Sequence, residues 1–70
     1  MKEYISNKVQ GLRHKKGLTQ EELADKVKVS RQTIVAIEKG NYTPSVHLAL
    51  SLADFFNVTV EDIFEICYEK

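Results

Sequence analysis

Apolar residues recur along most of the chain every three or four positions, which is the spacing of one face of an α-helix. Each apolar series follows a residue that can cap a helix, and most end at Gly or Asn, which accept left-handed backbone. We therefore expect five helices. They run from Ser6 or Asn7 to Lys16, from Thr19 to between Lys26 and Lys28, from Ser30 to Gly40, from Thr43 to Asn57, and from Thr59 through Phe64.

The second and fourth helices have the clearest starting signals. Thr19 precedes Glu22 by three positions, the spacing of a capping box in which each side chain accepts a hydrogen bond from the other residue's backbone N–H. Pro44 follows Thr43, and proline is favoured at the first position of a helix. The inward faces of all five helices predict one core. Its expected members are Ile5, Val9, Leu12, Leu23, Ala24, Val27, Val29, Ile34, Ile37, Leu48, Ala49, Leu52, Ala53, Phe56, Ile63 and Phe64.

The end of the chain changes period. Phe64, Ile66 and Tyr68 alternate with more polar residues, and such alternation favours a β-strand. The partner of this strand would be Lys2–Ile5, which gives a small terminal ribbon. The alternative is a frayed continuation of the fifth helix, and the pattern alone does not decide between the two.

The second and third helices are separated by only three or four residues. Two short helices joined so closely pack at a steep angle, as in a helix-turn-helix motif. Because Ile34 and Ile37 take the inward positions of the third helix, its opposite side faces outward. The residues on or beside that outward line are Arg31, Gln32, Val35, Ala36 and Lys39.

The charges are unevenly distributed although they cancel overall. Residues 1–43 contain nine Lys or Arg and five Asp or Glu, whereas residues 44–70 contain one Lys and five acids. The first part is therefore +4 and the second −4. This segregation predicts that one end of the molecule attracts a polyanion and the other repels it.

Several function classes have little support in the sequence. The longest apolar stretch, Leu48–Phe56, is too short to span a bilayer, and we expect a soluble cytoplasmic protein. Cys67 is the only cysteine, so no internal disulfide can form. It also has no base nearby in sequence, while His14 and His47 lack metal-ligand spacing. We expect no enzyme activity, no cofactor and no metal.

Four segments together resemble one known family. They are Gln20–Ala24, Val29–Ile34, Ile37–Gly40 and the pair Pro44-Ser45, at spacings similar to those of the Xre/Cro, lambda-repressor-like helix-turn-helix repressors. The resemblance covers roughly residues 6–64. It implies an all-α, five-helix domain that binds double-stranded operator DNA as a two-fold homodimer.

The length of the chain, 70 residues, is that of one small domain. Residues 1–70 would form a single DNA-binding domain, with the helix-turn-helix at about 19–39 and a dimerisation region at 60–70. One position departs from the family pattern, since many relatives carry Gly in the turn where this chain has Lys28. A residue other than glycine in left-handed conformation costs on the order of 1 kcal/mol.

The outward residues of the third helix have side chains suited to reading bases in the major groove. Gln32 can form paired hydrogen bonds with adenine, and Arg31 can do so with guanine or bind phosphate instead. Val35 and Ala36 can meet thymine methyl groups, although an exposed valine can also be a plain surface residue. The predicted contacts to the DNA backbone are Gln20, Thr33, Lys39, Asn41 and Tyr42. The alternative for Gln20 is an ordinary polar residue in the first turn of a helix, and for Tyr42 it is packing under the loop.

Two further sets of residues have expected structural roles. The resemblance places Arg13 opposite Glu38, and we expect an internal ion pair that braces the first helix against the third. The expected dimer contacts are Leu50, Phe55, Phe64, Ile66 and Tyr68, with completion of the monomer core as the alternative for each.

Two functions remain open at this stage. The first is a transcriptional regulator, expected to be a repressor that binds a palindromic operator. The second is an antitoxin-type module that neutralises a partner protein and regulates its own synthesis. No small-molecule ligand or membrane partner is evident from the sequence.

Overall fold

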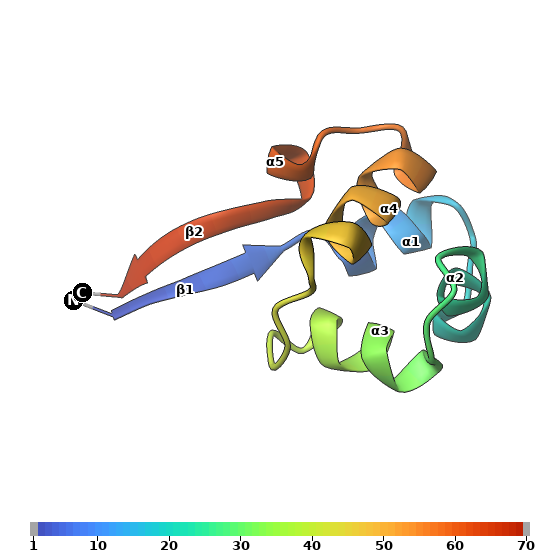
Figure 1. Ribbon diagram of the computed structural model, residues 1–70, viewed down its shortest axis with the longest axis horizontal. Helices are drawn as coiled ribbons and strands as arrows, with labels where there is room; N and C mark the ends of the chain where they lie inside the picture. Colours follow the sequence, from blue (N-terminus) through green and yellow to red (C-terminus); the bar gives the residue numbers. More distant parts are fainter. Residues whose placement is uncertain (1, 70) are drawn as a thin grey trace.

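The computed structural model describes residues 2–69, so Met1 and Lys70, which the expected domain and dimerisation region include, lie outside the described residues. The described chain contains a strand, then five consecutive helices, then a second strand. Figure 1 shows the two terminal strands side by side, apart from the helices. The elements are β1 (Lys2–Asn7), α1 (Val9–Lys15), α2 (Gln20–Lys26), α3 (Arg31–Glu38), α4 (Val46–Phe56), α5 (Val60–Ile63) and β2 (Phe64–Glu69). The predicted five helices are therefore confirmed, and so is the terminal ribbon.

Side-chain caps start four of the five helices. Thr19 and Glu22 form the predicted capping box, and Thr59 forms a second one with Asp62. The hydroxyl of Ser30 accepts a hydrogen bond from the Thr33 N–H at the start of α3. These bonds satisfy backbone donors that have no partner inside the helix, and so they determine where α2, α3 and α5 begin.

The predicted start of α4 was wrong. The helix begins at Val46, after Thr43 and Pro44, because the hydroxyl of Ser45 caps it by accepting the Leu48 N–H at 3.1 Å. Proline has a backbone angle that suits the end of a loop as well as the first turn of a helix, and here it lies in the loop.

The limits of α1 and α5 also differ from the prediction. Helix α1 begins at Val9 rather than directly after Ser6 or Asn7, because both of these residues belong to β1. Helix α5 ends at Ile63, since Phe64 already has extended backbone and opens β2. Pairing between the two terminal strands takes up backbone groups that a longer helix at either place would have used.

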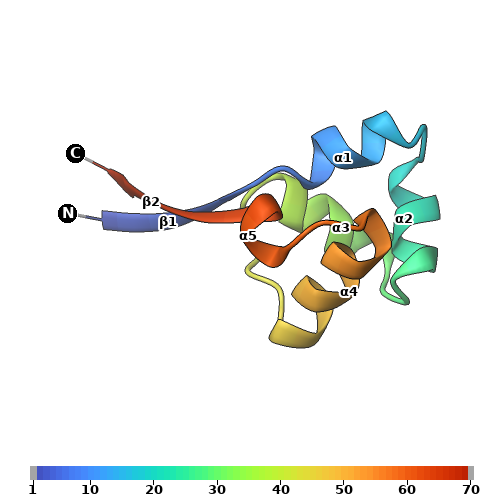
Figure 2. The ribbon, with the colours of Figure 1, turned by 90° about the horizontal axis from the view of Figure 1, so that it is seen from above.

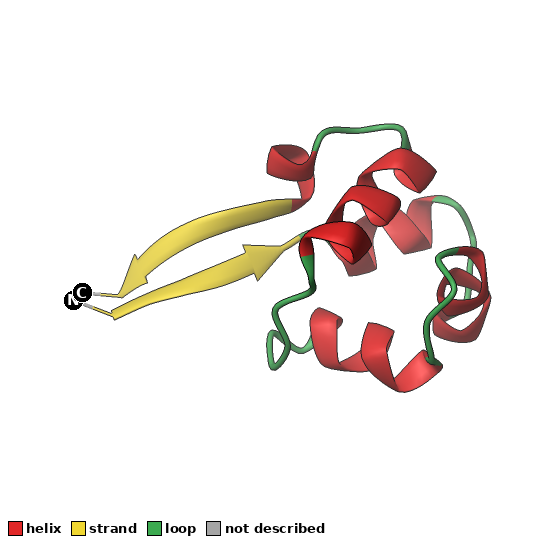
Figure 3. Ribbon diagram, viewed as in Figure 1, coloured by secondary structure: helices red, strands yellow, loops and turns green. Residues whose placement is uncertain are grey.

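The two strands form an antiparallel ribbon that extends away from the helices, as Figure 1 and its rotated view in Figure 2 show. The register runs from Lys2 opposite Glu69 at the far end to Asn7 opposite Phe64 beside the helices. The secondary-structure colouring in Figure 3 shows no helical turn beyond α5, which excludes the frayed-helix alternative.

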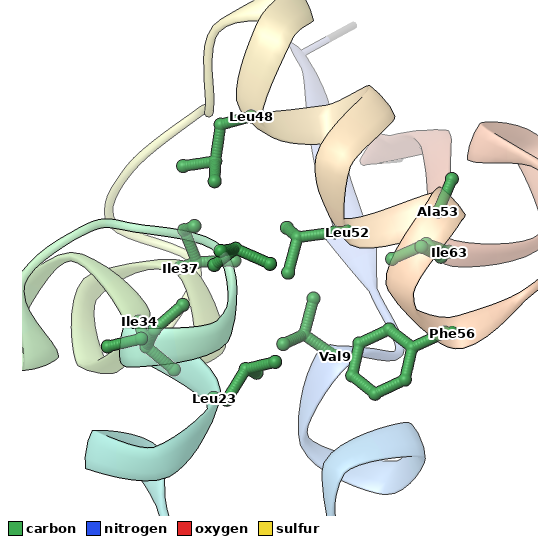
Figure 4. Packing of buried hydrophobic residues seen from close by; sticks show 11 residues of the cluster. Val9, Leu23, Ile34, Ile37, Leu48, Leu52, Ala53, Phe56 and Ile63 are labelled. Atoms are coloured by element: carbon green, nitrogen blue, oxygen red, sulfur yellow. The ribbon is translucent and has the colours of Figure 1, made fainter.

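The core lies among the helices, and Figure 4 shows its side chains converging from α1, α2, α3, α4 and α5. Its largest fully buried members are Leu23, Ile34, Ile37, Leu52, Ile63 and Val9. Most of the predicted core is confirmed. The exceptions are Ile5, Leu12, Val29, Ala49 and Phe64, which are half-buried.

Candidate nucleic-acid interface

Helices α2 and α3 are joined by a short turn whose conformation requires left-handed backbone. Lys28 has φ of +61°, as expected from its place in the sequence. The Val29 N–H then donates to the Ala24 carbonyl at 2.9 Å and closes the turn. Leu23 and Ala24 from α2 lie in the same core as Ile34 from α3. The inner side of α3 is thereby anchored, and its outer side faces solvent.

The first turn of α3 carries exposed polar groups. Arg31 and Gln32 are both exposed, and within residues 2–69 neither side chain forms a hydrogen bond to another protein group. Val35 and Ala36, on the following turn, are half-buried. The structure thus leaves the guanidinium and the amide free to bind an external partner, with a small apolar surface beside them.

The expected DNA-backbone residues fall into two groups. Lys39, Asn41 and Tyr42 are exposed where the chain leaves α3. Thr33 is half-buried, and its hydroxyl shares a 3.0 Å hydrogen bond with that of Ser30. The first group is fully available to a polyanion, whereas the Thr33 hydroxyl already takes part in the cap of α3.

Gln20 has an internal partner that the sequence did not indicate. Its Nε2 donates to Glu38 Oε1 at 3.0 Å, which links the start of α2 to the end of α3. The amide is therefore held against α3, and the predicted phosphate contact by Gln20 has to be compatible with that bond.

Arg13 and Glu38 form a two-point ion pair between α1 and α3. Arg13 Nε lies 2.7 Å from Glu38 Oε2, and Arg13 Nη2 donates to Oε1 at 3.1 Å. In a third hydrogen bond, Arg13 Nη1 donates to the Leu18 carbonyl at 2.8 Å, which further fixes the position of the guanidinium. Both side chains are almost completely buried, with 9% and 5% of their surface exposed. The pair fastens α3 to α1.

The same contacts shift the pKa values of both groups. Burial by itself raises the pKa of Glu38, but hydrogen bonds from Arg13 and Gln20 and the charge of Arg13 outweigh it, so the pKa lies below its ordinary value. The hydrogen bond to Glu38 raises the pKa of Arg13 against the opposing effect of burial. Both groups are therefore charged at neutral pH.

Asn7 is a positioning residue whose bond to α3 the sequence did not indicate. Its Oδ1 accepts the Val9 N–H at 3.1 Å, and its Nδ2 donates to the Ile37 carbonyl at 2.8 Å. One side chain thus connects the end of β1, the start of α1 and the last turn of α3. The only sequence signal was an asparagine directly before a helix, which suggests the cap but not the bond to α3.

The five expected dimer residues differ in how much surface they offer. Leu50, Ile66 and Tyr68 are 56%, 54% and 60% exposed. Phe64 and Phe55 are half-buried and pack against the core. The ring of Phe55 also meets that of Phe56 edge to face, with Lys16 Nζ 5.3 Å from its centre. The monomer itself already covers part of these two phenylalanines.

Within residues 2–69, no helix is long and apolar enough to cross a membrane.

A helix-turn-helix family model matches residues 10–63, which include all five helices except the first residue of α1. An uncharacterized HTH-type transcriptional regulator from Methanocaldococcus jannaschii is 57% identical over 60 residues, covering 86% of this chain and 91% of its own. The cryptic phage CTXphi transcriptional repressor RstR from Vibrio cholerae is 34% identical over 59 residues, 84% of this chain and 53% of its own. Among solved structures, transcriptional regulator VanUg superposes with a TM-score of 0.78 at 26% identity, covering 99% of this chain and 92% of that one.

The matched region contains the whole α2–α3 motif, and the fold agrees over nearly the full chain. The protein therefore belongs to the lambda-repressor-like helix-turn-helix family of DNA-binding transcriptional regulators, which are not enzymes.

Proposed function

We propose that this protein represses transcription by binding a palindromic operator as a homodimer, with α3 of each protomer in the major groove. The proposal rests on the exposure of Arg31 and Gln32 and on their lack of hydrogen-bond partners within residues 2–69. Both are exposed and without partners in the described chain, on a helix whose other side is buried and whose far end is fixed by ion pairing.

The side chains of α3 suggest which base edges are read. Gln32 presents an amide that matches N6 and N7 of adenine, and Arg31 presents a fork that matches O6 and N7 of guanine. Val35 and Ala36 offer apolar surface to thymine methyl groups. Lys39, Asn41 and Tyr42 follow α3 directly and would bind phosphates, which orient the helix without specifying sequence.

The ribbon supports a homodimer. Residues paired across an antiparallel ribbon share a face, and every second pair lies on the same side. One face therefore carries Ile5 with Ile66 at its centre, flanked by the pair Glu3 and Tyr68 and by the pair Asn7 and Phe64. Ile66 and Tyr68 are more than half exposed, although an isolated two-stranded ribbon is only marginally stable in water. Covering this face with the same face of a second copy would remove apolar surface from water and stabilise both ribbons.

Two-fold symmetry has a consequence for the DNA site. A single short helix makes few base contacts, whereas specific binding usually reaches Kd values of about 10⁻⁸–10⁻¹¹ M. In a two-fold dimer, the two recognition helices enter successive turns of the major groove on the same side of the DNA. The half-sites must therefore lie about 34 Å apart and be inverted relative to each other. The proposed operator is therefore palindromic. Repression is the simplest result of occupying it, and the similar protein RstR is named a repressor.

Selection of binding sites from random duplex DNA tests this function directly. We expect an inverted repeat whose half-sites are centred about 10–10.5 base pairs apart, enriched at both low and high salt. Sedimentation of the purified protein should show a dimer, and a reporter controlled by the selected site should lose expression when the protein is present. Failure to enrich any sequence would refute base reading, and increased reporter expression would refute repression.

A further inference from the structure

A concavity of about 560 Å³ lies between the helix-turn-helix turn and α4. We call its apolar lining residues the floor; they are Val27, Val29, Leu48 and Phe55. We call its polar lining residues the rim, and most of them can donate hydrogen bonds. These donors are Lys26, Lys28, Thr33, Tyr42, Ser45, His47 and Ser51, and Asp54 is the one acid among the lining residues. This combination suits a ligand that is anionic and has an apolar body.

Lys28 is the most unexpected residue on this rim. Its backbone is left-handed, with φ of +61°, a conformation that glycine adopts freely and that side-chain-bearing residues disfavour. Glycine would complete the turn without this cost. A backbone position that disfavours lysine but carries one suggests that the side chain contributes something outside the turn itself.

The charge of Lys28 is not compensated within the protein. Across residues 2–69, the only salt bridge joins Arg13 to Glu38, and Lys28 is exposed. Lys26 differs in this respect, because its charge helps to lower the pKa of Glu22 on the same helix. Lys28 is therefore the rim cation with the most freedom to bind an external anion.

We propose that this concavity seats the sugar–phosphate backbone of the DNA strand beside the groove that α3 enters, with Lys28 as its cationic phosphate contact. The inference rests on the proposed DNA-binding function. Thr33 and Tyr42 connect the concavity to the expected interface, since both line it and both are expected backbone contacts. A strand of DNA supplies both a phosphate for Lys28 and an apolar sugar edge for the floor.

Salt dependence distinguishes a phosphate contact from a structural role. On the duplex obtained by selection, each phosphate contact contributes about 0.9 to the slope of log affinity against log salt. We expect Lys28→Gly and Lys28→Asn to lower that slope by about 0.9, and Lys28→Arg to retain it. Between 50 and 200 mM salt, the advantage of the original protein over Lys28→Gly should shrink about threefold. Lys15→Gln, which removes an exposed lysine from α1, should leave the slope unchanged.

Thermal unfolding provides a second measurement, in which Lys28→Gly should not weaken the protein as it weakens DNA binding. Glycine relieves the left-handed strain, so Lys28→Gly should melt at the same temperature as the original protein or higher while binding DNA more weakly. An unchanged salt slope in both Lys28→Gly and Lys28→Asn would overturn the inference and leave the proposed function standing. So would thermal stabilisation by 10 mM inorganic phosphate that depends on Lys28 without any change in slope, because it would assign a small-anion site. If the original protein binds no duplex at low salt, the proposed function fails as well.

Discussion

The two ends of α3 are held in opposite ways. At its C-terminal end, Glu38 accepts hydrogen bonds from Arg13 and Gln20, and the Ile37 carbonyl accepts one from Asn7. At its N-terminal end, Arg31 is exposed and has no such partner within the described chain. The difference indicates that the two ends of this eight-residue helix have different roles. The fixed end sets the direction of the helix, and the free end is available for contact.

The comparison also predicts different consequences of mutation. Loss of a partner at the fixed end leaves a buried polar group unsatisfied and should destabilise the whole domain. Loss of the Arg31 or Gln32 side chain at the free end breaks no side-chain hydrogen bond within the described chain and should change binding alone. Four experiments can test this separation.

The largest effect is expected from Arg13→Ala. This change leaves the Glu38 carboxylate buried without its cation and should lower the free energy of unfolding by roughly 3–5 kcal/mol. A domain of this size has roughly 4–10 kcal/mol in total, so urea should unfold the variant at a much lower concentration. Affinity should weaken equally for all DNA sequences. Glu38→Gln is the control, because its single amide oxygen can still accept one of the two hydrogen bonds from Arg13, and it should lose less. An unchanged urea midpoint in Arg13→Ala would contradict a stabilising role of the ion pair between Arg13 and Glu38.

Gln32→Ala tests the free end. We expect a loss of about 1–3 kcal/mol in binding, confined to one base pair of each half-site, with relaxed preference there. The free energy of unfolding should stay within about 0.5 kcal/mol of the original value, as for most exposed residues. Gln10 on α1 is also an exposed glutamine and provides a control whose replacement by alanine should change neither quantity. Unaltered base preference in Gln32→Ala would remove this residue from the reading surface.

Asn7→Asp separates the two bonds of that side chain. Aspartate can still accept the Val9 N–H, but it cannot donate to the Ile37 carbonyl, so stability should fall by about 1 kcal/mol. Chemical denaturation measures the loss. Asn7→Ala removes both bonds and should be less stable than Asn7→Asp. If the two variants were equally stable, the bond to α3 would account for the whole effect and the bond to the Val9 N–H for none.

The smallest effect concerns pH. Because the folded state lowers the pKa of Glu38, its contribution to stability is complete above the pKa of an unfolded glutamate and is lost as pH falls through the folded-state pKa. Denaturation at several pH values between 7 and 3 should therefore show a steeper acid loss in the original protein than in Glu38→Gln. Parallel curves would show that Glu38 does not carry this pH dependence.

Local signals in the sequence predicted much of the fold. Thr19, Ser30 and Thr59 cap the helices as expected, because a cap depends on residues three positions apart. The left-handed turn at Lys28 was expected from the family resemblance instead, because many relatives carry glycine at that position. The start of α4 was not predicted correctly, since Pro44 and Ser45 each offer a plausible beginning and only the backbone around them decides between the two.

Contacts between distant segments were harder to foresee. Alternation over Phe64–Glu69 suggested a strand with Lys2–Ile5 as its partner, but it did not decide between this ribbon and a longer fifth helix. The observed pairing also continues to Asn7, which the pattern did not indicate. The exposure of Gln32 followed from helical period, whereas the bond between Gln20 and Glu38 depends on the angle between α2 and α3. Family resemblance supplied the pairing of Arg13 with Glu38, which periodicity does not reveal.

The register of the ribbon makes the chain suitable for backbone cyclisation. Lys2 lies opposite Glu69, at the tip farthest from α3 in Figure 1, so a short peptide bridge could join these strand ends without stretching either one. A closed circle has fewer disordered conformations than an open chain, and its folded form would gain relative stability from that lost freedom. New termini could then be opened in the exposed loop at 39–43, which would give a circular permutant of the same architecture.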